Sequence, residues 1–272
     1  MVLNRKTVIK RSILMLVLAG TVLQSCGTLP EESASAKPSF SAADAFHIVA
    51  KENDVARTLY TKAIVGAGKK KGLKFDEDWE MAEVEAGPLP ALFLRGISSE
   101  IKSGSVPLGL YLGSDFPVRK SNKFTGKQAE LFAQIKEDAE ARIFLDSENQ
   151  LQTAMFPDFG TAAACITCHN EHPETMKTDW KLGDIMGATT WTYPKDSLTY
   201  EEVVEIVGAY RKGAIATYNK YLDKMSGFKT EAIPEIGDKW PSEGFYLPTA
   251  EVFMDSVGKL ASAETMVGIL KM

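Results

Sequence analysis

Residues 164–173 read Ala164-Cys165-Ile166-Thr167-Cys168-His169-Asn170-Glu171-His172-Pro173, and they hold two of the three cysteines and two of the three histidines of the chain. In the pattern Cys-x-x-Cys-His, two thiols one helical turn apart form thioethers with the vinyl groups of a haem, and the imidazole binds the iron. The pattern arises by chance in about one chain in a thousand of this length. We therefore predict one covalent c-type haem on Cys165 and Cys168, with His169 as the proximal iron ligand.

Three other roles of the two cysteines explain the pattern less well. A zinc site would need about four Cys or His ligands at paired spacing, and the chain has no second Cys pair. A thioredoxin-like redox pair would follow a strand in a βαβ unit and would not need His169. A structural disulfide between Cys165 and Cys168 suits an exported protein but leaves His169 unexplained.

The first 25 residues predict an export signal. They contain four basic residues and no acidic one, followed by the apolar stretch Ile13–Gly20 and then Leu23-Gln24-Ser25-Cys26. The apolar stretch is too short to span a bilayer. Leu-x-Ser-Cys resembles the lipobox of bacterial lipoproteins, so we expect residues 1–25 to be a lipoprotein signal peptide and Cys26 to be acylated. The alternative is a buried hydrophobic helix with an inert Cys26.

Acyl chains on Cys26 would hold the exported protein at a membrane surface, in the periplasm. The following residues are rich in Ser, Ala, Pro and Glu, which predicts a flexible tether over residues 26–43. Without the signal peptide the chain has 27 basic and 36 acidic residues, a net charge of −9. This acidic balance argues against a nucleic-acid partner, because phosphate contacts need a basic surface.

Apolar periodicity predicts an α+β domain. Four helices are expected, at residues 44–65, 91–102, 200–225 and 249–260. The run Gly66–Gly72 ends the first of them, and the apolar stripe of the third is expected to be a packing face. Four strands are expected, at residues 106–112, 141–146, 151–156 and 184–193, with a hairpin turn at Asp146–Gln150.

The surroundings of the Cys-x-x-Cys-His motif resemble a known family. Residues 164–188, which end in Asp179-Trp180-Lys181-Leu182-Gly183-Asp184-Ile185-Met186-Gly187-Ala188, resemble a family of c-type haem domains with a PAS-like fold. Many of its members are sensor parts of bacterial signalling proteins. A looser match comes upstream, from Ser114, Pro117, Arg119 and Asn122. The resemblance implies a PAS-like antiparallel sheet with flanking helices over residues 44–197, and residues 198–272 are then a C-terminal helical extension.

By this resemblance, Cys165 and Cys168 bind the porphyrin and His169 is the proximal ligand. Arg119 would contact a haem propionate, with a solvated surface arginine as the alternative. His172 would hydrogen-bond near the haem or organise the loop before Pro173, and we favour the structural role.

The chain departs from the family on the distal side of the haem. The best-described member uses a cysteine as second axial ligand, and the equivalent position here falls near Leu92–Leu94, which cannot ligate iron. The distal ligand is therefore water, nothing, or an unexpected side chain such as His47 or Met81.

Two functions follow from different classes. The first is a monohaem cytochrome that exchanges electrons with a redox partner at the membrane surface. The second is a haem-based redox or gas sensor (NO, CO or O2) that signals through a separate protein, since an open distal site favours gas binding. An enzyme such as a peroxidase is a minor third option, because no distal His and Arg pair can be recognised.

Overall fold

The computed structural model describes residues 39–229 and 233–270. The described residues form one compact unit. No helix within the described ranges is both long enough and apolar enough to cross a bilayer. The predicted signal peptide (residues 1–25) and the predicted lipidation site Cys26 lie outside the described residues.

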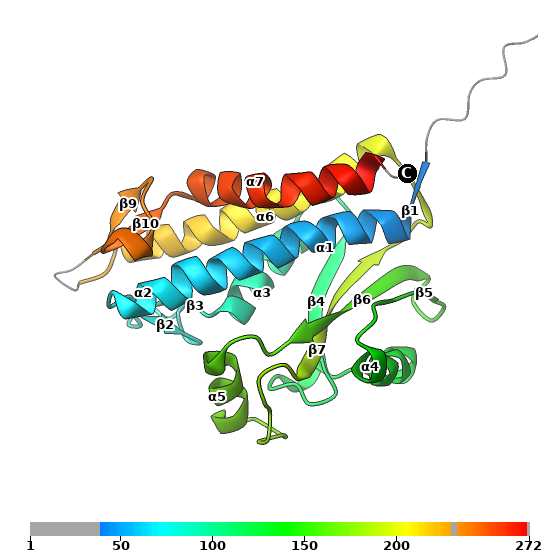
Figure 1. Cartoon of the computed structure of the whole chain (residues 1–272), viewed down its shortest axis with the longest axis horizontal. Helices are drawn as coiled ribbons and strands as arrows, with labels where there is room; N and C mark the ends of the chain where they lie inside the picture. Colours follow the sequence, from blue (N-terminus) through cyan, green and yellow to red (C-terminus); the bar gives the residue numbers. More distant parts are fainter. Residues whose placement is uncertain (1–38, 230–232, 271–272) are drawn as a thin grey trace, which may run out of the picture. The chain divides into compact units, whose positions relative to one another are not determined.

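The predicted α+β fold is confirmed. Its sheet has four antiparallel strands in the order β4-β7-β6-β5, with helices packed beside it (Figure 1). The strands are β4 Gly109–Gly113, β5 Arg142–Asp146, β6 Leu151–Phe159 and β7 Ile185–Tyr193. Each of them overlaps one of the four predicted strands.

The predicted hairpin turn joins β5 to β6. The Asp146 carboxylate accepts hydrogen bonds from the backbone N–H of Glu148 (3.2 Å) and the side-chain amide of Asn149 (2.9 Å). Gln150 completes the turn in the left-handed region, at a φ of 56°. The turn fixes the register in which Asp146 pairs with Leu151.

The first helix is longer than the sequence predicts. α1 (Ala42–Leu59) begins with a capping box, in which Ser41 and Asp44 each bond the other's backbone N–H. It continues without a break into the π-helical segment Tyr60–Gly66 and then α2 (Ala67–Lys70). The glycine-rich run therefore ends the helix at its far end, where Gly72 has a φ of 99°.

Five further helices complete the main elements. They are α3 (Pro90–Ser103), α4 (Gly126–Asp138), α5 (Ala163–Glu171), α6 (Tyr200–Met225) and α7 (Ala250–Leu270). The helices predicted at residues 91–102, 200–225 and 249–260 are confirmed as α3, α6 and α7. The sequence reading missed α4 and α5, and α7 extends well beyond its predicted end.

Short strand pairs join the main elements. β1 (Ser39–Ser41) pairs with β8 (Ser197–Thr199), β2 (Phe75–Asp76) with β3 (Gly87–Pro88), and β9 (Glu235–Gly237) with β10 (Tyr246–Pro248). Two 3-10 turns lie at Lys120–Asn122 and Pro241–Glu243. Because β1 and the start of α1 fall at residues 39–43, that end of the predicted tether is regular structure.

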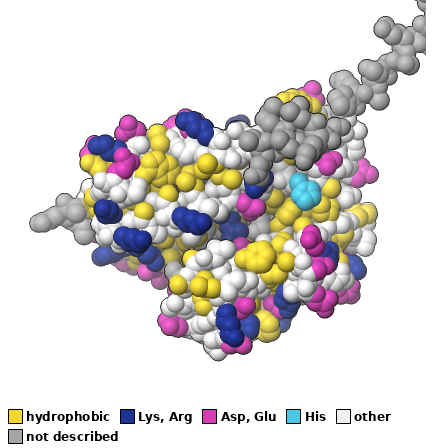
Figure 2. Space-filling model, in the orientation of Figure 1, with side chains coloured by type: hydrophobic (Ala, Val, Ile, Leu, Met, Phe, Trp, Pro, Cys, Tyr) yellow, Lys and Arg dark blue, Asp and Glu magenta, His cyan; other side chains and the backbone are white. Residues whose placement is uncertain are grey.

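The main hydrophobic core lies between the helices and one face of the sheet. In it the Phe93 ring stacks on Tyr60 at 4.1 Å, and the Phe253 ring stacks on Tyr218 at 5.0 Å. α6 packs along α3, and α7 packs along α1. Residues 44–197 and 198–272, which the sequence predicts as two parts, thus share one core. Acidic and basic side chains are interspersed over the outer surface shown in Figure 2.

A second, smaller core lies on the opposite face of the sheet. There α4 places Phe132 and Ile135 against Met155 of β6. Both faces of the sheet are therefore covered by helices, at least over its central strands β6 and β7.

Candidate functional site

The Cys-x-x-Cys-His motif lies on α5, within the long connection between the adjacent strands β6 and β7 (Figure 1). Backbone hydrogen bonds close the base of this connection, from Gly160 N to Asp184 O (2.9 Å) and from Gly183 N to Gly160 O (3.0 Å). A Cβ atom at Gly160 would come within 2.7 Å of both Ile166 Cδ1 and Met186 Sδ. Glycine at this position thus lets the start of α5 pack closely on the first residues of β7.

The helix brings the three predicted haem-binding residues onto one face. Cys165, Cys168 and His169 stand at positions i, i+3 and i+4 of α5, and side chains at this spacing are neighbours on a helix surface. Both thiols are free; Cys165 is half-buried and Cys168 exposed. Two thiols one turn apart with an imidazole beside them are the donor set that covalent haem attachment requires.

The chain after the motif is held to α5 by side-chain hydrogen bonds. Asn170 and Trp180 form a reciprocal pair, from Asn170 Nδ2 to Trp180 O (3.1 Å) and from Trp180 N to Asn170 Oδ1 (2.9 Å). The Thr175 hydroxyl donates to the carbonyl of His169 (2.6 Å). At His169 only the backbone carbonyl takes part in these bonds, and no described residue forms a hydrogen bond with its ring.

The ring of His172 has both nitrogens engaged. Its Nδ1 accepts a hydrogen bond from the backbone N–H of Glu174 (3.0 Å), and its Nε2 lies 3.0 Å from Glu77 Oε2. Glu77 belongs to the loop between β2 and β3. His172 therefore joins the end of α5 to that loop, and neither ring nitrogen is free to bind a metal.

Burial controls the protonation of the motif. Burial lowers the pKa of the His169 imidazole below its ordinary value, although the negative charge of Asp158 acts in the opposite direction. The ring is therefore neutral at pH 7, which is the form that binds iron. Burial also raises the pKa of the Cys168 thiol, and Glu77 adds to this effect while Lys69 of α2 opposes it.

A charged pair that the sequence did not reveal lies beside His169. Arg57 of α1 bonds Asp158 of β6 at 2.9 Å and donates to the Thr189 hydroxyl of β7 at 3.2 Å. Each of the two charged side chains is only 23% exposed. The pair joins α1 to the sheet immediately before the chain leaves β6 for α5, and it also sets the charge near His169.

Loss of this pair is expected to destabilise the protein. Arg57→Leu leaves the Asp158 carboxylate half-buried without its cation, so we expect the free energy of unfolding to fall by about 1–3 kcal/mol, less than for a fully buried pair. Urea unfolding followed by circular dichroism measures the change. The matched control is Arg119→Leu, since Arg119 is exposed and has no ion pair among the described residues. Equal stability of the two variants would contradict a structural role of Arg57.

The other predicted residues make no hydrogen bond, ion pair or ring contact with Cys165, Cys168 or His169 within the described part of the chain. Arg119 is exposed and precedes the 3-10 turn at Lys120–Asn122. His47 is exposed on α1, and its ring lies edge-on to that of Phe156, with 5.3 Å between the ring centroids. It precedes Arg57 by ten residues, which is about 15 Å along a helix. Met81 is exposed, and its carbonyl accepts a hydrogen bond from Lys224 Nζ (2.5 Å).

The residues near the expected distal position lie in the main core. Phe93 and Leu94 of α3 are fully buried in the main core, where Phe93 stacks on Tyr60. The residues near 92–94 therefore serve packing among the helices. The charged groups that act on the thiol and imidazole of α5 instead come from α2, from the β2–β3 loop and from the end of β6.

The donor set around α5 fits a haem. Besides the two thiols and the neutral imidazole, two buried N–H groups lack an acceptor among the described residues, Arg57 Nε and Trp180 Nε1. A haem brings two propionate carboxylates, which are the acceptors that such donors need. The propionate contact of Arg119 stays a prediction. No local pattern marks Arg57, which meets Asp158 across 101 positions.

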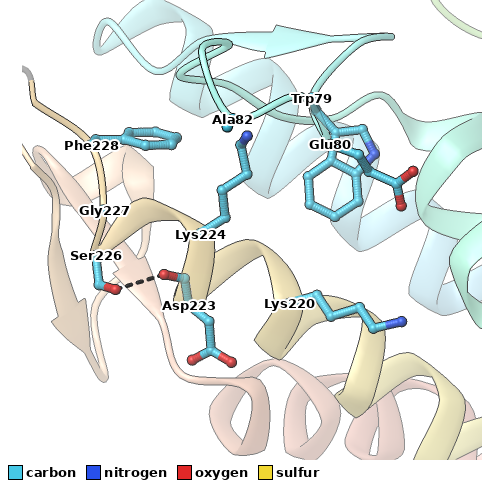
Figure 3. Close-up of a pocket in the computed structure, with 9 residues that line it drawn as sticks. All are labelled: Trp79, Glu80, Ala82, Lys220, Asp223, Lys224, Ser226, Gly227 and Phe228. Atoms are coloured by element: carbon cyan, nitrogen blue, oxygen red, sulfur yellow. Dashed lines mark hydrogen bonds between the residues drawn. The ribbon is translucent and has the colours of Figure 1, made fainter.

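A cavity of about 610 Å³ lies apart from α5, between the β2–β3 loop and the end of α6. Figure 3 shows the side chain of Lys224 extending between Phe228 and Trp79. The cavity is open to solvent, and its lining also includes the charged Lys220 and Asp223. None of the three motif residues takes part in it, so it is not the candidate haem site.

Comparison with known proteins agrees with the geometry. A family model described as Tll0287-like matches residues 35–194, which is more than half of the chain. This is a family of c-type haem domains with a PAS-like, sensor-type fold. No curated protein and no solved structure matches the chain.

Proposed function

The chain belongs to the Tll0287-like family, and from this membership we propose that it is an exported, lipid-anchored c-type cytochrome that carries one haem and exchanges electrons with a partner protein. The observation that carries the proposal is the face of α5, where two free thiols lie beside a neutral imidazole that has no hydrogen-bond partner among the described residues. The sequence contains a single Cys-x-x-Cys-His motif, which supports one haem per chain.

In this proposal each residue of the site has a defined task. Cys165 and Cys168 hold the haem through thioethers, and His169 is the proximal ligand. The haem supplies one-electron chemistry at iron. Asp158, held by Arg57, places a negative charge near His169, which favours the oxidised iron and so lowers the reduction potential.

The anchor and the partners are proposed from the sequence. Leu23-Gln24-Ser25-Cys26 supports lipidation of Cys26, export and attachment at a membrane surface facing the periplasm. The partner that we propose for the haem domain is a redox or signalling protein. The net charge is acidic, and basic and acidic side chains are interspersed over the face shown in Figure 2, so we propose no nucleic-acid partner.

One observation favours a sensor as the second candidate function. Both ring nitrogens of His172 are already hydrogen-bonded. His47 lies ten residues before Arg57 on α1 and packs against Phe156. The residues near 92–94 are part of the main core. Neither histidine therefore offers a strong second axial ligand, and Met81, the other predicted alternative, is exposed in the β2–β3 loop. An iron open on that side binds small gases, as a sensor requires.

Carbon monoxide separates the two functions. For an electron carrier with a strong sixth ligand, we expect the absorbance spectrum of the ferrous protein to be unchanged by CO, because the gas cannot displace that ligand. The measurement compares Soret spectra before and after CO at neutral pH. A shifted Soret band would contradict the carrier and support the sensor.

Removal of the lipidated cysteine tests the anchor. We expect Cys26→Ser to move most of the protein from the membrane fraction to the soluble fraction. Without acyl chains on residue 26, only the apolar stretch Ile13–Gly20 could hold the protein at the membrane, and this stretch is too short to span a bilayer. Immunoblots of separated membranes measure the distribution. Cys165→Ala is the control and is expected to stay with the membrane, whereas an unchanged distribution of Cys26→Ser would contradict lipidation.

A further inference from the structure

The two edges of the sheet differ in how their backbone is covered. At one edge, the Leu110 carbonyl of β4 accepts a hydrogen bond from the Ser98 hydroxyl of α3. At the other edge, β5 pairs with β6 alone (Figure 1), and no described residue bonds the outer N–H and C=O groups of β5. An unpaired edge is a template for another strand, and proteins usually block it with Lys, Pro or a bulge. β5 contains neither Lys nor Pro and pairs without a bulge.

Apolar side chains extend to this edge. Ile143 and Leu145 point to the same side of the sheet as Ala154, which is fully buried beneath the helices. On β5 the helical cover has ended, so Ile143 is 37% exposed and Leu145 is 52% exposed. The open backbone edge is thus combined with an uncovered apolar strip.

The sequence of β5 is complementary to itself. When Arg142-Ile143-Phe144-Leu145-Asp146 is paired with a second copy in antiparallel register about Phe144, Arg142 lies opposite Asp146 and Ile143 lies opposite Leu145. Both charge pairs are then opposite in sign and both apolar pairs are matched. Cross-strand pairs of these two kinds stabilise antiparallel strands.

We propose that β5 is a docking edge for a second copy of this chain, so that two four-stranded sheets join into one across a two-fold axis. The interface is isologous, as in most symmetric dimers, because the same strand contributes from both copies. Arg142 already bonds Asp138 of α4 (2.5 Å) on the α4 side of the sheet, and the partner's carboxylate would join this pair. The alternative occupants of the edge are another protein or another segment of this chain.

The expected strength follows from the size of the contact. One five-residue strand from each copy buries less than the roughly 1,000 Å² that stable interfaces need, so the dimer is transient in solution. Confinement to a surface raises the effective concentration of a weak pair. This last point rests on the proposed lipid anchor, whereas the pairing itself does not.

Disulfide trapping tests the register in membranes that contain the full-length, haem-loaded protein. Two tagged copies are co-expressed, one with Ile143→Cys and one with Leu145→Cys, and a mild oxidant is added. Directly opposed positions lie within disulfide reach. We therefore expect Ile143→Cys and Leu145→Cys to give at least roughly three-fold more cross-linked dimer than two copies of Leu260→Cys, because the yield follows the fraction of paired copies. Leu260 is a matched control, because it is 60% exposed on α7.

Charge reversal makes the test specific. When both copies carry Arg142→Asp, the new carboxylate of each copy lies opposite Asp146 of the other. This like-charge repulsion is expected to lower the cross-linked yield at least roughly three-fold. Adding Arg142→Asp to one copy and Asp146→Arg to the other restores opposite charges across the strands, although it cannot repair the bond to Asp138. Recovery of the yield is therefore expected only when the two copies pair in this register.

Two results would overturn the proposal: cross-linking at residues 143 and 145 no stronger than at residue 260, or a yield that ignores the charge changes. The haem absorbance of each variant reports its folding. The parent protein is a separate control for the proposed function. If Cys26 carries lipid and both Cys165 and Cys168 carry haem, the parent has no free thiol to cross-link. Cross-linking of the parent would count against those modifications without bearing on the β5 edge.

Discussion

Cys165→Ala together with Cys168→Ala is expected to abolish covalent haem attachment completely. The two thiols are the only cysteines on the described part of the chain, and thioether bonds to a c-type haem form at no other kind of side chain. Haem staining of a denaturing gel measures the result, because a covalent haem stays with the chain after unfolding. The parent band is expected to stain and the variant band to be blank.

The fold is expected to survive this substitution. Cys168 is exposed and Cys165 half-buried, so truncation of each thiol leaves little cavity and costs less than about 1 kcal/mol. Thr167→Ala is the matched control, because Thr167 is an exposed neighbour on α5 that lies between the two thiols in sequence. This control is expected to stain as the parent does. A stained band from the doubly substituted protein would refute haem attachment at this motif.

Phe253→Ala is expected to lower the free energy of unfolding by about 3–5 kcal/mol. Phe253 of α7 is fully buried, stacks on Tyr218 at 5.0 Å and lies edge-on to Phe93 at 5.9 Å. Its removal leaves a cavity where α7 meets α3 and α6. A loss of this size is a large part of the stability of an ordinary domain.

The same experiment asks whether the C-terminal helices and the haem-bearing part unfold together. Urea unfolding is followed by circular dichroism and by haem absorbance, and we expect both midpoints to move together in Phe253→Ala. The control is Leu260→Ala, an exposed position on the same helix, where the change stays within about 0.5 kcal/mol. A haem signal that keeps its midpoint while the helical signal shifts would show that residues 198–272 unfold separately.

Local patterns predicted the sheet and the long helices because these elements carry their own periodicity. The buried side chains of α6 recur at the helical spacing, and Asp146–Gln150 has the composition of a turn. α4 was missed because only Leu131, Phe132 and Ile135 are buried, too few to stand out as a stripe. α5 was missed because its thiols, imidazole and polar side chains give it almost no apolar face.

The motif itself could be predicted from sequence, but its surroundings could not. Cys165, Cys168 and His169 are adjacent in the chain, so their spacing alone places them on one helical turn. The pair between Arg57 and Asp158 and the contact between Glu77 and His172 join residues that are about a hundred positions apart. Only the tertiary structure brings such charges together, and this is why the sequence did not point to Arg57.

The packing of α1 against α7 sets the order in which the molecule can be completed. The first long helix finds its partner only at residues 250–270, so the core cannot close until almost the whole chain has been delivered. Contacts this distant in sequence also form slowly. The thiols at 165 and 168 precede α7 by about eighty residues. If they bind haem as proposed, the late arrival of α7 would leave both thiols accessible before the core closes.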